Sequence, residues 1–130
     1  MADQFASVNL TTFFNDNENK NTLAKTLGHV RLFQEFIKTK YGVSTAIHQI
    51  SPAELNKYVA VFVVSVRKAD GGEYEPSYIR GFVSSFDRQL KRHRYGTQII
   101  SNDILFSEAR EALRMKQRDL KGRAPREVNR

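Results

Sequence analysis

The sequence predicts an all-α fold, a compact bundle of four main helices. Apolar residues recur at steps of three and four along several stretches, which is the spacing of an amphipathic helix. One stretch opens with Ser51-Pro52-Ala53-Glu54, in which a serine cap, a proline at the first helical position and a glutamate two residues later form a capping box. At 130 residues the chain has the length of one domain and can bury a core between such helices.

The first main helix is expected over residues 21–40, with Asn21 as its N-cap and Gly42 just past its end. Its apolar stripe comprises Leu23, Leu27, Val30, Phe33, Phe36 and Ile37. The residues expected elsewhere on this helix include Lys25, His29 and Lys40. Residues 1–18 are rich in Asn and charge, so we expect a flexible segment, although its phenylalanines could dock on the core.

The second helix follows the Ser51 cap and has the apolar body LNKYVAVFVVSV. Its many valines are also typical of a buried strand. The capping box favours a helix, and apolar residues on almost all sides predict that this helix is the central, most buried one.

The third helix is expected to begin at Glu75-Pro76 and to end before Gly96. Its core stripe comprises Ile79, Phe82, Val83, Phe86 and Leu90. The opposite side carries Arg80, Ser84, Asp87, Arg88, Lys91 and Arg94. These polar residues also recur at steps of three and four, so we expect them to share one face.

A fourth helix is expected from a cap at Asp103 to about Lys121, with Gly122 ending it. Its inward residues are Phe106, Ala109, Leu113 and Leu120. The helical domain is thus predicted over residues 19–122, and residues 123–130 form a basic tail or linker.

Several classes of site are absent from the sequence. It has no cysteine, which excludes disulfides, thiolate zinc sites and cysteine nucleophiles. The three histidines lack metal-ligand spacing, and no P-loop or serine-hydrolase motif occurs. We therefore expect no metal, no cofactor and no complete active site. The absence of a long apolar run and of a signal peptide predicts an intracellular protein that does not bind a membrane.

The positive charge lies in the second half of the chain. The net charge is +7, which favours polyanionic partners, nucleic acid first. Residues 67–94 hold seven basic and four acidic residues, and residues 110–130 hold eight and three. The polar face of the third helix can meet phosphates and base edges. An ordinary solvated face, with Asp87 paired to Lys91, explains the same pattern, as does a plain basic surface for the fourth helix.

The run from Glu54 to Gly96 resembles the N-terminal part of Crypton-type tyrosine recombinases. It also resembles the domesticated Crypton-derived domains of MYM-type zinc-finger proteins and glutamine-rich transcription regulators. The most specific pieces are LNKY…F..SVRK.DG.EYEP and the helix after it, with Ser85, Phe86, Asp87 and Arg88. The stretch FSEAREALRMKQRDLKG resembles the next family segment, so the resemblance covers most of residues 51–122.

The resemblance implies a SAM-like core-binding domain that clamps one side of double-stranded DNA during recombination and integration. The first and third helices would lie across the major groove. Together with the charge pattern, it predicts DNA contacts by Lys25, His29, Arg80, Ser84, Arg88, Lys91, Arg94, Arg114, Arg118 and Lys121.

The catalytic Arg, Lys, His and nucleophilic Tyr set of that family has no counterpart in this sequence. The chain is therefore expected not to be an enzyme by itself, but a recombinase fragment or a domesticated remnant acting in the nucleus. Its tail would lead toward a catalytic domain, through which the protein could self-associate on DNA. A protein-interaction or oligomerisation bundle of a transcription or chromatin regulator is the alternative.

Overall fold

The computed structural model describes residues 4–17, 19–101 and 104–128. Every regular element among them is helical, which confirms the all-α prediction. The helices are α1 (Leu10–Asn17), α2 (Lys20–Tyr41), a short 3-10 helix η1 (Ile47–Gln49), α3 (Pro52–Ser65), α4 (Pro76–Arg92) and α5 (Ser107–Val128). None of these helices is long and apolar enough to cross a membrane, as far as the described ranges extend.

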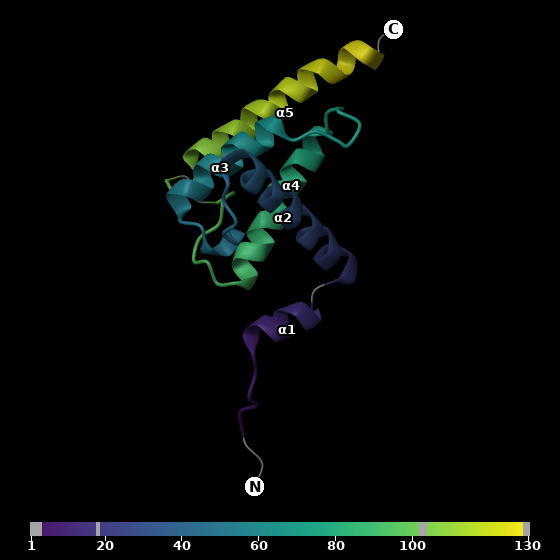
Figure 1. Ribbon diagram of the computed structural model, residues 1–130. Helices are drawn as coiled ribbons and strands as arrows, with labels where there is room; N and C mark the ends of the chain where they lie inside the picture. The colour runs from purple at the N-terminus through teal and green to yellow at the C-terminus, as the bar shows by residue number, and fades with distance from the viewer. Residues whose placement is uncertain (1–3, 18, 102–103, 129–130) are drawn as a thin grey trace.

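Four of these helices, α2 to α5, build the bundle. Helix α5 packs along α3 and also contacts α4, while α2 packs on α4 (Figure 1). Helix α1 lies outside the bundle, beyond the start of α2 (Figure 1). It falls within the segment that the sequence predicts to be flexible, and its first turn is capped by Asn9, whose side chain accepts the N–H of Thr12 at 3.0 Å.

Phenylalanines from three helices meet at the centre of the core. Phe62 of α3 is 1% exposed, and its ring lies 5.5 Å from Phe33 of α2. The rings of Phe82 and Phe86 of α4 lie 5.3 Å and 5.5 Å from Phe62. All five predicted core residues of α4 are buried. On the predicted outward side Arg80 and Lys91 are exposed, whereas Asp87 is buried.

The caps of α2 and α3 agree with the prediction, with one correction. The Ser51 side chain accepts the Glu54 N–H, which confirms the predicted cap of α3. Gly42 adopts a φ of +70° after α2 and donates to Lys38 O, also as predicted. The prediction of Asn21 as the N-cap of α2 is wrong. Asn19 caps this helix, because its side chain accepts the N–H of Asn21 at 2.8 Å.

The two ends of α5 differ from the sequence prediction. The expected cap, Asp103, lies outside the described residues. Asn56 of α3 supplies a cap from across the core, since its Oδ1 accepts the N–H of Ala109 at 2.9 Å. The helix also continues through Gly122 to Val128. Gly122 does not adopt a positive φ, and a glycine inside a helix costs only about 1 kcal/mol relative to alanine.

The connector between α4 and α5 is held by a buried carboxylate. Asp87 accepts the N–H groups of Ile99 at 2.6 Å and Ile100 at 3.1 Å. The predicted solvent-facing pair of Asp87 with Lys91 is therefore wrong, because the carboxylate turns toward the connector. Burial raises the pKa of Asp87, and the two backbone donors partly oppose this shift.

Replacement of Phe62 by alanine tests the aromatic core. Phe62→Ala should lower the free energy of unfolding by about 3–5 kcal/mol, because it removes a fully buried ring that contacts phenylalanines of two neighbouring helices. Urea denaturation followed by circular dichroism measures the loss. The control is Val64→Ala on the exposed side of α3, which should stay within about 0.5 kcal/mol. Equal effects of the two substitutions would contradict this assignment of the core.

Candidate nucleic-acid interface

The outward side of α4 carries a row of polar residues. Arg80 and Lys91 are exposed and Ser84 is partly exposed. Helical spacing places these three on one face, opposite the buried stripe. Arg94 is exposed beyond the end of α4, where the backbone adopts a φ of +54°. Four of the residues predicted to bind DNA therefore lie on an accessible part of the surface.

Arg88 belongs to the predicted row but turns sideways toward α2. Its Nε donates to the hydroxyl of Thr26 at 2.9 Å, and its Nη2 donates to the hydroxyl of Ser85 at 2.9 Å. Both hydroxyl-bearing residues are fully buried. Arg88 is thus partly buried and connects α4 to α2, rather than standing free on the surface.

His29 is buried at the same contact. Its Nδ1 lies 2.8 Å from the Ser85 hydroxyl and its Nε2 lies 3.3 Å from the Tyr78 hydroxyl. The prediction of His29 outside the apolar stripe, as a DNA contact, does not match this burial, while Leu27 of the predicted stripe is 43% exposed. The reason is a polar seam between α2 and α4, formed by Thr26, His29, Ser85 and Arg88. A hydrophobic pattern cannot reveal such a seam.

Lys25 lies at the edge of the α2–α4 polar seam. It is exposed, and its Nζ is 5.9 Å from the centroid of the Tyr78 ring. Tyr78 itself stacks on Tyr74, with ring centroids 4.8 Å apart. This geometry suits a cation–π contact, and it leaves the Lys25 ammonium accessible to an anion.

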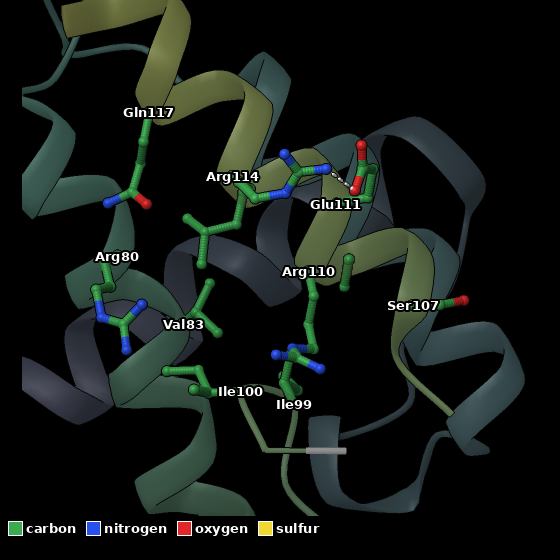
Figure 2. Close-up of a pocket in the computed structure, with 11 residues that line it drawn as sticks. Arg80, Val83, Ile99, Ile100, Ser107, Arg110, Glu111, Arg114 and Gln117 are labelled. Carbon is green, nitrogen blue, oxygen red and sulfur yellow. Dashed lines mark hydrogen bonds and ion pairs between the residues drawn. The ribbon is translucent and has the colours of Figure 1, made fainter. Parts of the chain in front are cut away.

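A hollow of about 480 Å³ separates α4 from α5. Its lining includes three arginines, Arg80 of α4 with Arg110 and Arg114 of α5 (Figure 2). Arg114 forms an exposed ion pair with Glu111, the one acidic residue among those lining the hollow. The described lining of the α4–α5 hollow thus contains three arginines and one glutamate.

The other cations of α5 separate into surface and interior residues. Arg118 and Lys121 are exposed. Lys116, one of the eight basic residues of 110–130, is 7% exposed, and its Nζ lies 3.1 Å from the carboxylate of Glu73. Lys116 lies on the side of α5 that faces the core. A buried lysine there is stable because its ammonium is paired with a carboxylate.

The structure brings some of the predicted DNA-contact residues together, and it places one further arginine beside them. Arg80 and Arg114 line the same hollow, whereas Lys25, His29 and Arg88 gather at the α2–α4 polar seam. Arg110 was not among the predicted DNA contacts. Its position four residues before Arg114 places both on one helical face, which is the pattern that could have identified it.

His48 and His93 are distant in sequence but stack in the structure. Their ring centroids are 3.8 Å apart and the rings are inclined by 9°. Burial lowers the pKa of His93, with His48 and Arg92 adding to the effect. Across the described ranges, no group of three or more His, Cys, Asp or Glu side chains could hold a metal ion.

No protein-family model, curated protein or solved structure matches this chain. A functional assignment therefore depends on the geometry and charge of the residues themselves. Two features carry it, the exposed basic face of α4 and α5 and the α4–α5 hollow within that face.

Truncation of Arg88 distinguishes an interior role from a surface role. Arg88→Ala should lower the free energy of unfolding by about 1–3 kcal/mol, because it leaves hydroxyl groups of the seam without their donor. Lys91→Ala, one turn away on the exposed face, should stay within about 0.5 kcal/mol. Thermal or urea unfolding compares them. If Arg88→Ala is as stable as Lys91→Ala, the seam does not depend on the guanidinium.

The buried imidazole also predicts a pH dependence. Burial lowers the pKa of His29 below its ordinary value of 6.5, and Lys25 and Arg88 lower it further. The unfolded chain then binds the proton more readily, so the stability present above the unfolded pKa is lost as pH falls below it. His29→Asn should weaken the loss of unfolding free energy between about pH 7.5 and pH 5.5. Denaturation at both pH values measures it, and an unchanged pH dependence would contradict the assignment.

Proposed function

We propose that this chain binds duplex DNA, as the core-binding domain of a Crypton-like tyrosine recombinase or as its domesticated remnant. The observation that carries the proposal is the set of exposed cations on α4 and α5, two helices that pack against each other. They are Arg80, Lys91, Arg114, Arg118 and Lys121, with Arg110 in the hollow between the helices. Phosphate contacts from such a face supply most of the affinity for duplex DNA.

The length of the α4 row suits a DNA groove. Arg80 and Lys91 are eleven residues apart, which corresponds to roughly 16 Å along a helix axis. The major groove of DNA is about 12 Å wide. The two cations can therefore reach phosphates on both edges of the groove, while Ser84 lies between them and can donate to a base edge.

The resemblance to the recombinase family supports the same orientation. In that family the helix corresponding to α4 lies across the major groove, together with the helix corresponding to α2. Here Arg88 and His29 join these two helices from behind the exposed face. We therefore assign them a positioning role, and assign direct contact to Lys25, Arg80, Ser84 and Lys91.

The test compares two variants of equal net charge. Arg80→Gln with Lys91→Gln removes two cations from the proposed interface. Lys38→Gln with Lys57→Gln removes two exposed cations from α2 and α3 outside it. Fluorescence anisotropy with a labelled duplex, measured over a series of salt concentrations, gives the log–log salt slope. The first variant should reduce that slope by about 0.9 for each phosphate that the protein no longer neutralises, and the control should leave it nearly unchanged.

Equal losses of affinity in the two variants would contradict the groove-docking proposal, because binding would then depend on net charge alone. A protein partner is a separate outcome of the same assay. If an acidic polypeptide binds more tightly than the duplex and shows the same dependence on Arg80 and Lys91, the basic face is a protein-interaction surface instead.

A further inference from the structure

The N-terminal arm of the chain, residues 1–19, exposes apolar side chains outside the bundle. Phe5 is 83% exposed, Val8 is 57% exposed, and Leu10, the first residue of α1, is 41% exposed. Figure 1 places α1 beyond the start of α2, away from the four packed helices. A single exposed apolar side chain is common on protein surfaces, whereas a group of them marks an interaction site. The arm therefore has the properties of a segment that packs against another surface.

Helix α1 is too short to be stable without packing. It spans eight residues with the sequence LTTFFNDN. Isolated helices shorter than about 12–15 residues are only marginally stable in water. Threonine, phenylalanine, asparagine and aspartate are also weaker helix formers than alanine or leucine. The cap at Asn9 supplies one hydrogen bond, so most of the stabilisation of α1 has to come from contacts of its apolar side chains.

The first half of α2 carries an apolar stripe that its own bundle leaves partly uncovered. The members of this α2 stripe recur at steps of three and four and therefore share one side of the helix. They are Lys20, Leu23, Leu27 and Arg31. Leu23 is partly exposed and Leu27 is 43% exposed. The two cations at the ends of the α2 stripe are exposed as well.

The charges of the arm and of the first half of α2 are complementary. Residues 1–19 contain three acidic and no basic side chains, whereas residues 20–34 contain three basic and no acidic side chains. Two of these three cations, Lys20 and Arg31, belong to the α2 stripe. DNA and anionic membranes repel an acidic arm. The partner that fits the arm is a basic and apolar protein surface, and complementary charge of this kind selects the partner.

The short connection between α1 and α2 favours a second copy of the chain over the same copy. Only two residues separate Asn17 from Lys20. The second of them, Asn19, caps α2, since its side chain accepts the N–H of Asn21 and its carbonyl oxygen accepts the N–H of Leu23 at 2.9 Å. Antiparallel helices are joined by about two to five residues, so little chain is left to turn α1 back onto its own α2. Short hinges favour exchange of an element between two copies.

We propose that the chain forms a dimer in which the arm of each copy packs on the α2 stripe of the other. The apolar side chains of the arm cover Leu23 and Leu27, and its acidic charge meets Lys20 and Arg31. The contact is reciprocal, so two copies close the assembly and neither arm stays exposed.

The α2 stripe is separate from the residues assigned to DNA contact. Lys25 is two residues from both leucines of the stripe, and residues two apart on a helix do not share a face. Its Nζ lies instead 5.9 Å from the ring centroid of Tyr78 on α4. The dimer therefore leaves the proposed DNA contacts accessible, and the inference does not depend on the proposed function.

Sedimentation equilibrium of the full chain over a series of concentrations measures the assembly. We expect a monomer–dimer equilibrium. Phe5→Ser with Leu10→Ser should weaken dimerisation at least tenfold, because it removes two exposed apolar side chains from the arm. The matched control, Val64→Ser with Met115→Ser, removes two exposed apolar side chains from α3 and α5 and should leave dimerisation unchanged. A monomer at every concentration, or equal weakening in the two variants, would overturn the proposal.

Charge reversal tests the other side of the contact. Lys20→Glu with Arg31→Glu should also weaken dimerisation at least tenfold. Lys38→Glu with Lys57→Glu reverses two exposed cations outside the α2 stripe and should have little effect. Circular dichroism verifies that each variant keeps its helical content. If both charge reversals weaken dimerisation equally, association depends on net charge alone and the proposed contact is wrong.

A spin label distinguishes exchange between copies from folding of the arm within one copy. Because the chain has no cysteine, Ala6→Cys accepts a single label in the arm. This labelled chain is mixed with unmodified chain whose methyl groups are isotope-labelled. The proposal expects broadening of the Leu27 methyl signals in the mixture. Broadening only when the label and Leu27 belong to the same chain would overturn it, as would a dimer whose Leu27 signals stay sharp in both samples.

Discussion

The packing of α2, α3 and α4 depends on the contact of Phe62 with phenylalanines from two neighbouring helices. Its ring meets Phe33 of α2 and both Phe82 and Phe86 of α4 at centroid distances between 5.3 Å and 5.5 Å. Edge-to-face packing of such rings is favourable and geometrically specific. Because Phe82 and Phe86 must point into this cluster, Arg80 and Ser84 must point away from it. The orientation of the basic face is thus a consequence of the core.

Two buried polar side chains then determine where α5 lies. Asn56 of α3 accepts the N–H of Ala109 in the first turn of α5, and Asp87 of α4 accepts two N–H groups of the preceding connector. A buried polar group without a partner costs free energy, so these bonds restrict the connector to one path. That path brings Arg110 and Arg114 beside Arg80 and creates the hollow.

The net charge of the chain overstates the charge that a ligand can meet. Arg88 is bound to Thr26 and Ser85 in the α2–α4 polar seam, and Lys116 is buried against Glu73. These cations stabilise contacts between elements of the fold. The cations that remain exposed include Arg80 and Lys91 of α4 and Arg114, Arg118 and Lys121 of α5. A polyanion can therefore meet fewer cations than the net charge of the chain suggests.

The sequence by itself determined the four main helices of the bundle and most of the apolar side chains that they bury. Local patterns carry this information, since the Ser51 cap, Gly42 and the apolar spacing of α4 depend only on neighbours along the chain. Tertiary structure alone decided the roles of Asn56, Asp87, His29 and Arg88. Each of these side chains forms a hydrogen bond to a group at least twelve residues away in the sequence. It also decided that Arg80 and Arg110, thirty residues apart, share one hollow. Hydrophobic periodicity gives the direction of a polar side chain relative to its own helix, but the partner that this side chain meets depends on how the helices pack.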